Sequence, residues 1–106
     1  MNGTHVAGLD LPVSQLALGT MGFGDTVDAA MAASLVDAAL DAGITVIDTA
    51  NVYAGGVSEE ILARILPKRR DSILLATKAG MPHRDAEGHH PLSDTGLRRS
   101  VDGSLS

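Results

Sequence analysis

Three side chains in this sequence have the types needed to deliver a proton: Asp48, Tyr53 and Lys78. Asp48 and Lys78 each follow a short apolar run, ITVI at 44–47 and ILLAT at 73–77, of the kind that forms a buried strand. A phenol has a reference pKa of about 10, so alone it donates a proton poorly at neutral pH. A nearby ammonium stabilises the phenolate, and a carboxylate keeps that ammonium charged and oriented. Together the three residues predict a general-acid device.

Spacing alone leaves a second interpretation open for the acid and the lysine. At the ends of neighbouring parallel strands, Asp48 and Lys78 could form an ion pair that only stabilises the fold. Tyr53 favours chemistry, because it is one of only two aromatic residues in the chain and comes five residues after the acid.

Strands and helices are expected to alternate around these residues. A hairpin that turns at Gly8-Leu9-Asp10 precedes a strand at 16–19. The two apolar runs at 44–47 and 73–77 are the other strands, expected to be covered on both faces. Helices are predicted at 28–42, at 58–66 where Pro67 ends the helix, and from about 94 onward.

The apolar spacing also predicts which helical faces are buried. The first helix has Thr26 or Asp28 as its cap and Gly43 after its end, and its buried face comprises Met31, Leu35, Val36, Ala39 and Leu40. The second begins with Ser58 as a capping residue, and its buried face comprises Ile61, Leu62, Ile65 and Leu66. The last helix presents Leu97, Val101 and Leu105, spaced four apart.

The repeat length predicts the fold class. Thr20, Asp48 and Lys78 are 28 and 30 residues apart, about the length of one βα unit. Such alternation implies a parallel sheet, which must be covered on both faces or closed into a barrel. Three units give neither. We therefore expect residues 1–106 to be the N-terminal part of a (β/α)8 barrel, with a hairpin and about three βα units, ending inside the last helix.

Composition narrows the function classes. A net charge of −5 in 106 residues does not favour binding to nucleic acid or to an anionic membrane. The absence of cysteine excludes disulfides and thiolate catalysis. No signal peptide and no apolar run of about 20 residues is found, so a cytoplasmic protein is expected.

Four segments of the sequence resemble the aldo-keto reductase family. They are LALGTMGFG at 16–24, AALDAGITVIDTA at 38–50, YAGGVSEEIL at 53–62 and ILLATKAG at 73–80. The resemblance covers almost the whole chain in the order and spacing of the family. It implies an eight-stranded barrel whose bottom is closed by the hairpin. It also implies NADPH-dependent interconversion of aldehydes or ketones with alcohols.

The resemblance also implies site residues. The family's catalytic tetrad is Asp, Tyr, Lys and His, and Asp48, Tyr53 and Lys78 match its first three members. The fourth has no match, because the chain's histidines (His5, His83, His89 and His90) stand at the wrong positions. The resemblance places Gly19, Thr20, Met21 and Asp48 near the nicotinamide. A non-catalytic barrel that serves as a binding or regulatory subunit is the alternative function.

Two further patterns carry less information. The glycines of GTMGFG at 19–24 are spaced G-x-x-G-x-G, which is not the order of a dinucleotide-binding fingerprint. The loop at 79–93 holds His83, Asp85 and other possible metal ligands, but a solvated loop is favoured and no metal is expected. The resemblance to the aldo-keto reductases implies that this loop helps to shape the substrate pocket and gates access to it.

Overall fold

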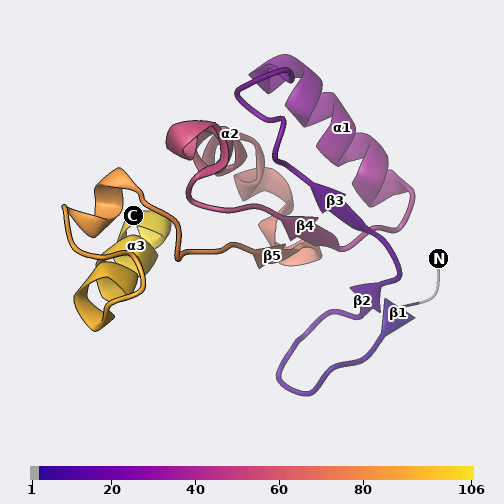
Figure 1. Cartoon of the computed structure of the whole chain (residues 1–106). Coiled ribbons are helices and arrows are strands. Elements are labelled where there is room, and N and C mark those ends of the chain that lie inside the picture. Colours follow the sequence, from indigo (N-terminus) through magenta and orange to yellow (C-terminus); the bar gives the residue numbers. More distant parts are fainter. Residues whose placement is uncertain (1–2) are drawn as a thin grey trace.

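Two small sheets organise the computed structural model, which describes residues 3–106. The first is an antiparallel hairpin of β1 (Gly3–Thr4) and β2 (Val13–Ser14). The second is parallel, in the order β3-β4-β5, formed by β3 (Ala17–Gly19), β4 (Val46–Asp48) and β5 (Leu74–Ala76). Figure 1 shows the hairpin at one end of the parallel strands.

Helices follow each parallel strand. They are α1 (Ala29–Asp41), α2 (Val57–Ile65) and α3 (Asp94–Leu105), with short 3-10 turns η1 (Tyr53–Gly56), η2 (Pro67–Ser72) and η3 (Arg84–Ala86). The predicted order of hairpin, then three strand–helix units, is confirmed. No helix among residues 3–106 has the length and apolar content needed to cross a bilayer.

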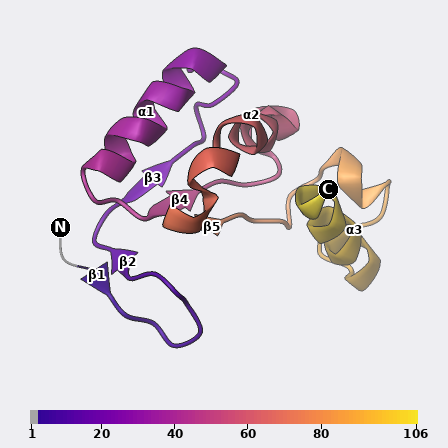
Figure 2. The same ribbon diagram turned by 180° about the vertical axis from the view of Figure 1, so that it is seen from behind.

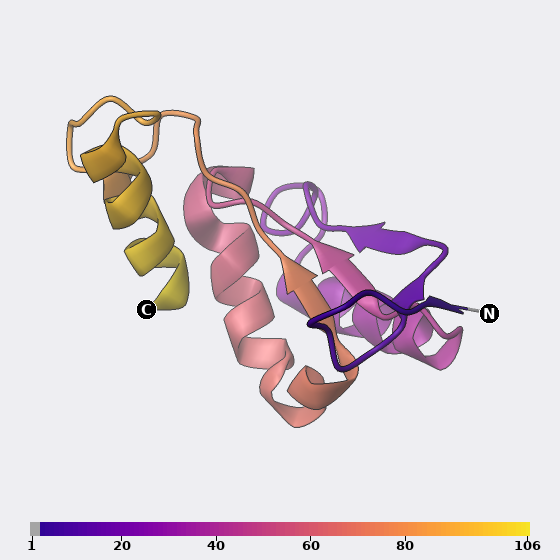
Figure 3. The same ribbon diagram turned by 90° about the horizontal axis from the view of Figure 1, so that it is seen from below.

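The core lies between the parallel sheet and the layer of α1 and α2. Figures 1 and 2 show both helices on one side of the sheet, and Figure 3 views the molecule from below. The buried cluster comprises Phe23, Ala32, Val36, Ile47, Ile61, Leu62, Leu66 and Ile73. Ile47 of β4 is central to it, so its neighbour Asp48 must point to the opposite face of the strand.

The hairpin is fastened to the start of β4. The Thr45 amide donates to Ser14 Oγ at 2.9 Å, and the Ser14 amide donates to Thr45 Oγ1 at 3.1 Å. The Thr45 hydroxyl in turn donates to the carbonyl of Pro12 at 2.7 Å. These bonds hold the hairpin at the amino ends of the strands, away from Asp48.

Helix α1 has the predicted ends and a shifted buried face. Asp28 caps it by accepting from the Met31 amide at 2.8 Å, and Gly43 follows its end with φ of 91°. The prediction that Met31 and Leu35 are buried was wrong, because both are exposed. The buried residues of α1 are Ala32, Val36 and Ala39. Met31 and Leu35 each come one residue before a buried position, so their side chains are turned about 100° away from the buried face.

Helix α2 ends as predicted and begins differently. It stops at Ile65, two residues before Pro67. The prediction that Ser58 caps its start was wrong: Gly56 occupies that position, in the left-handed region with φ of 105°. Ser58 lies inside the first turn, is fully buried, and directs its hydroxyl toward the ends of β3 and β4.

The last unit departs furthest from prediction. Leu75 and Ala76 of β5 are exposed, since β5 is an edge strand that α3 does not cover. The apolar positions Leu97, Val101 and Leu105 of α3 are also exposed. Helix α3 packs instead against the preceding loop through small residues, among them Gly96 and Ser100, which let two backbones approach closely.

Candidate active site

The parallel register brings the candidate residues to one end of the sheet. Asp48 is the last residue of β4 and lies opposite Gly19 of β3 and Ala76 of β5. Beyond the strands, the Thr49 amide donates to the Ala76 carbonyl at 2.8 Å. The Asn51 amide donates to the Lys78 carbonyl at 3.1 Å, which keeps the two chain segments side by side past the sheet.

Lys78 is the centre of the site. Its Nζ donates to Asp48 Oδ1 at 2.7 Å, to the Thr49 carbonyl at 3.0 Å and to Tyr53 OH at 3.3 Å. An ammonium has three protons, so these three acceptors satisfy it fully. The predicted association of Asp48, Tyr53 and Lys78 is therefore present in the folded chain.

The surroundings favour the charged form of Lys78. The hydrogen bond that Lys78 donates to Asp48 raises the pKa of Lys78 above its ordinary value of 10.5, partial desolvation opposes this rise, and Tyr53 adds to it. The side chains of Lys78 and Asp48 remain 49% and 42% exposed. The site is thus open to small molecules and holds a permanent cation at neutral pH.

The backbone after β4 places the phenol over this cation. Tyr53 begins η1, where Ala54, Gly55 and Gly56 all have positive φ, of 52°, 64° and 105°. This left-handed run turns the chain sharply between β4 and α2. The Lys78 ammonium lies 5.1 Å from the centre of the Tyr53 ring. The Lys78 ammonium therefore makes a hydrogen bond to the Tyr53 hydroxyl and a cation–π contact with the Tyr53 ring.

The polarity of the phenol matters for its chemistry. Among the hydrogen bonds of residues 3–106, the Tyr53 oxygen only accepts, from Lys78. Its own proton is free to pass to a third molecule. The ammonium would stabilise the phenolate left behind, and the Asp48 carboxylate would hold the ammonium in place. This arrangement suits proton donation to an oxygen that gains negative charge.

Comparison with known proteins decides the family. The sequence profile described as Aldo/keto reductase family matches residues 15–106. The chain belongs to the aldo/keto reductase family. It is 37% identical to the uncharacterized oxidoreductase YrpG of Bacillus subtilis (strain 168), covering 99% of this chain and 36% of that protein. It is 32% identical to the aldo-keto reductase YhdN of the same organism, covering 99% and 34%.

A solved aldo/keto reductase supports the same assignment. The structure of aldo-keto reductase AKR11C1 from Bacillus halodurans, in its holo form, superposes with a TM-score of 0.79 at 32% identity, covering 99% of this chain and 35% of that one. The predicted fold class, part of a (β/α)8 barrel, is confirmed. The chain spans about a third of the length of these relatives.

The residues predicted to meet the cofactor lie beside the candidate aldo/keto reductase site. Gly19 ends β3 opposite Asp48, with open space where a side chain would begin, and Met21 is exposed. Thr20 is fully buried, and its amide, carbonyl and hydroxyl are all engaged within the protein. The end of β3 therefore offers an uncrowded surface next to Asp48.

The histidine-rich loop has structural bonds of its own. His83 Nδ1 accepts from the Asp85 amide at 3.2 Å, and the Arg84 guanidinium pairs with Glu60 of α2 at 3.0 Å. Glu87 pairs with Arg99 of α3 at 2.7 Å. No group of three histidine or carboxylate side chains gathers to hold a metal ion within the part of the chain that the structure describes.

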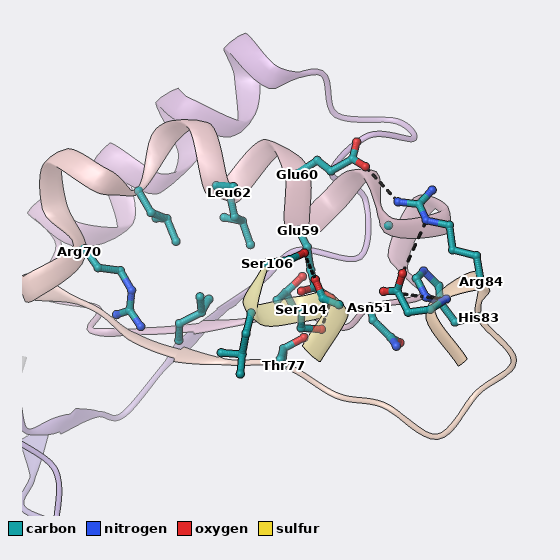
Figure 4. A pocket seen from close by; sticks show the side chains of 18 of the residues that line it. Asn51, Glu59, Glu60, Leu62, Arg70, Thr77, His83, Arg84, Ser104 and Ser106 are labelled. Atoms are coloured by element: carbon teal, nitrogen blue, oxygen red, sulfur yellow. Dashed lines mark hydrogen bonds and ion pairs between the residues drawn. The ribbon is translucent and has the colours of Figure 1, made fainter. Parts of the chain in front are cut away.

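A cavity of about 630 Å³ lies between α2, β5 and the end of α3 (Figure 4). Leu62 and Leu75 line its apolar part, and Asn51 and His83 lie at its polar end. Neither Asp48, Tyr53 nor Lys78 lines it. Thr49, whose carbonyl accepts from Lys78, also lines the cavity, so the cavity adjoins the candidate active site without including its three candidate catalytic side chains.

Sequence reasoning missed two contributors to the site. One is the Thr49 carbonyl, a backbone acceptor that residue types cannot reveal. The other is a cluster of buried hydroxyls from Thr20, Thr49 and Ser58 behind the strand ends. The sequence carried only a weak signal for it, because Thr20 after Gly19 and Thr49 after Asp48 also fit ordinary strand ends.

Proposed function

We propose that this chain carries the proton-donating part of an NADPH-dependent oxidoreductase that reduces aldehydes or ketones to alcohols. The observation that supports this best is the Lys78 ammonium bonded at once to Asp48, Thr49 and Tyr53, with the proton of Tyr53 left free. Membership of the aldo/keto reductase family supports the reaction class, since the family acts on carbonyls with nicotinamide nucleotides.

In this proposal the three residues have distinct roles. Tyr53 donates its proton to the carbonyl oxygen of the substrate. Lys78 stabilises the phenolate that remains, and Asp48 keeps Lys78 charged and oriented. A bound NADPH supplies the hydride that adds to the carbonyl carbon. Proton and hydride together convert the carbonyl into an alcohol.

The surface beside Asp48 fits a flat ring. Gly19 leaves open space at the end of β3, and Met21 next to it is exposed. We propose that Gly19, Met21 and Asp48 border the nicotinamide. Thr20, whose polar groups are all engaged, would contribute by fixing the strand end. The choice of NADPH over NADH is proposed from the family resemblance.

We further propose that residues 1–106 act as part of a larger barrel and are inactive alone. The relatives are about three times as long as this chain. The fourth catalytic residue, a histidine that orients the carbonyl, and most contacts to the cofactor would come from the remainder. The non-catalytic alternative has no support in the comparisons, where the relatives are named as oxidoreductases or reductases.

Replacement of Tyr53 by phenylalanine tests the proposal, because Tyr53→Phe removes a single oxygen atom. In a full-length aldo/keto reductase barrel that contains these residues, we expect kcat for aldehyde reduction to fall by about 10²–10⁴. The dissociation constant for NADPH, measured by nucleotide fluorescence, should stay within about twofold of the value for the unmodified protein. The reason is that the Tyr53 hydroxyl is proposed to act on the substrate in the transition state and not to bind the cofactor. Turnover that survives Tyr53→Phe unchanged would remove Tyr53 from the mechanism.

A further inference from the structure

Three buried hydroxyls meet directly behind the candidate active site. The Ser58 hydroxyl lies 3.0 Å from both the carbonyl and the hydroxyl of Thr20, and 3.1 Å from the hydroxyl of Thr49. All three side chains are at most 1% exposed. The proton-transfer roles proposed above use none of these three hydroxyls.

The cluster joins three elements at their site ends. Thr20 follows β3, Thr49 follows β4, and Ser58 lies in the first turn of α2. The Thr20 hydroxyl and amide both donate to the Asp48 carbonyl, at 3.2 and 3.1 Å. The backbone at Asp48 and Thr49 is therefore held from the helix side by hydroxyl groups.

Those two residues are also the strongest acceptors of the Lys78 ammonium. Asp48 offers its carboxylate at 2.7 Å and Thr49 its carbonyl at 3.0 Å. Any displacement of this dipeptide moves both acceptors, and with them the ammonium that faces Tyr53. A buried, satisfied hydroxyl network resists such displacement because each broken bond leaves a group without water.

We propose that Ser58 is a positioning residue, whose hydroxyl fixes the Asp48–Thr49 backbone so that Lys78 is held against Tyr53. This inference rests on the proposed function for its catalytic consequence, but the placement of Lys78 can be measured without turnover. Capping of α2 does not explain Ser58, because Gly56 occupies the capping position and the serine hydroxyl points into the cluster.

The sequence offers a simple spectroscopic test. Lys78 and Lys68 are its only lysines, so a chain labelled with 13C-lysine gives two Cε signals, and Lys68 is the internal reference. In Ser58→Ala the titration midpoint of Lys78 should fall toward the ordinary lysine value of 10.5, because the hydrogen bond from the ammonium to the displaced Asp48 carboxylate becomes longer and less well aligned. A midpoint identical to that of the unmodified chain would overturn the proposal.

Two further variants make the test secure. Thr49→Val removes a hydroxyl at nearly constant volume and should also lower the titration midpoint of Lys78. This variant replaces Ser58→Ala in the test if Ser58→Ala does not fold. Ser100→Ala is the matched control, because Ser100 is equally buried and its hydroxyl has no partner among the described residues. An equal shift in Ser100→Ala would show a general loosening and would also overturn the proposal.

Turnover of a full-length barrel that contains these residues separates this inference from the proposed function. Ser58→Ala should lower kcat by roughly ten- to a hundredfold with an unchanged KM for NADPH, since misplaced groups cost rate rather than binding. A lost Lys78 shift in a protein without reductase activity would uphold the positioning and refute the reductase. Normal turnover in Ser58→Ala would refute the positioning role and leave the proposed reductase function intact.

Discussion

At the scale of single residues, the site depends on how one ammonium shares its three protons. Two go to Asp48 and Thr49, and the third reaches Tyr53 at the longest of the three distances, 3.3 Å. The two shorter bonds fix the position of Lys78. The longer one leaves the phenol oxygen able to change its charge without losing its partner.

The link between Asp48 and Lys78 predicts a dependence of stability on pH. The pKa of Lys78 is raised in the folded chain, so its contribution to stability is complete below pH 10.5 and is lost as the pH rises through the raised pKa. Asp48→Asn removes the main cause of that rise. The advantage of the unmodified chain over Asp48→Asn should therefore be constant near neutral pH and shrink above pH 10.5.

Urea unfolding from about pH 8 to about pH 12, a range in which lysine titrates and arginine does not, measures this difference. Asp37→Asn is the control, because Asp37 pairs with Arg69 at 3.4 Å on the surface. Its effect should not change over this range. A gap between the unmodified chain and Asp48→Asn that persists to the highest pH would show that Lys78 gains nothing from the carboxylate.

At the scale of elements, periodicity located the helices and strands to within a few residues. It identified local features best, such as the Asp28 cap and the left-handed Gly43 of α1. Periodicity failed where the burial of a helix face depends on which other element packs against that face. The spacing of Leu97 and Val101 shows that α3 has an apolar stripe, but not that the loop before it packs against a different face.

Ser58 illustrates the same limit within the site. A serine before two glutamates is the usual signal for a helix start, yet here the capping position lies two residues earlier, at the left-handed Gly56. Asp48, Tyr53 and Lys78 were predictable because each is an unusual residue type at its place. The carbonyl of Thr49 was not, because every residue has one.

The packing of α3 predicts the effect of adding one methyl group. A side chain at Gly96 would run into the His90 carbonyl oxygen of the preceding loop. Alanine is the better helix former by about 1 kcal/mol, whereas overpacking costs about 1–3 kcal/mol. Because the obstructing oxygen belongs to the backbone, the cost lies at the upper end of that range, and we expect Gly96→Ala to lower the free energy of unfolding by about 2 kcal/mol in urea titrations.

Val101→Ala, on the exposed side of the same helix, is the comparison for that experiment. It should change the free energy of unfolding by no more than about 0.5 kcal/mol, as surface substitutions usually do. A Gly96→Ala chain as stable as the unmodified one would mean that α3 does not pack on the loop through this glycine. A large effect of Val101→Ala would mean that its apolar stripe is covered in solution.

At the scale of the whole molecule, the described chain has one well-packed layer and two open sheet edges. Helices α1 and α2 cover one face of the parallel sheet, as Figures 1 and 3 show. Of the edge strands, β3 contributes Ala17 and Gly19 to the exposed surface, whereas β5 exposes Leu75. An apolar edge with unpaired backbone groups is the surface on which a second copy of a chain can add a strand.

We therefore predict that the 106-residue chain self-associates through β5. Sedimentation velocity over about 10–500 µM should show a weight-average mass that rises with concentration, as expected of chains with exposed strand edges. Leu75→Lys places a charge on this edge and should weaken association by about tenfold or more. Leu97→Lys is closely matched, since Leu97 is 38% exposed and Leu75 37%, but it lies on α3. If Leu97→Lys abolishes association while Leu75→Lys leaves it intact, the copies meet through the apolar stripe of α3 and the sheet edge is not the contact.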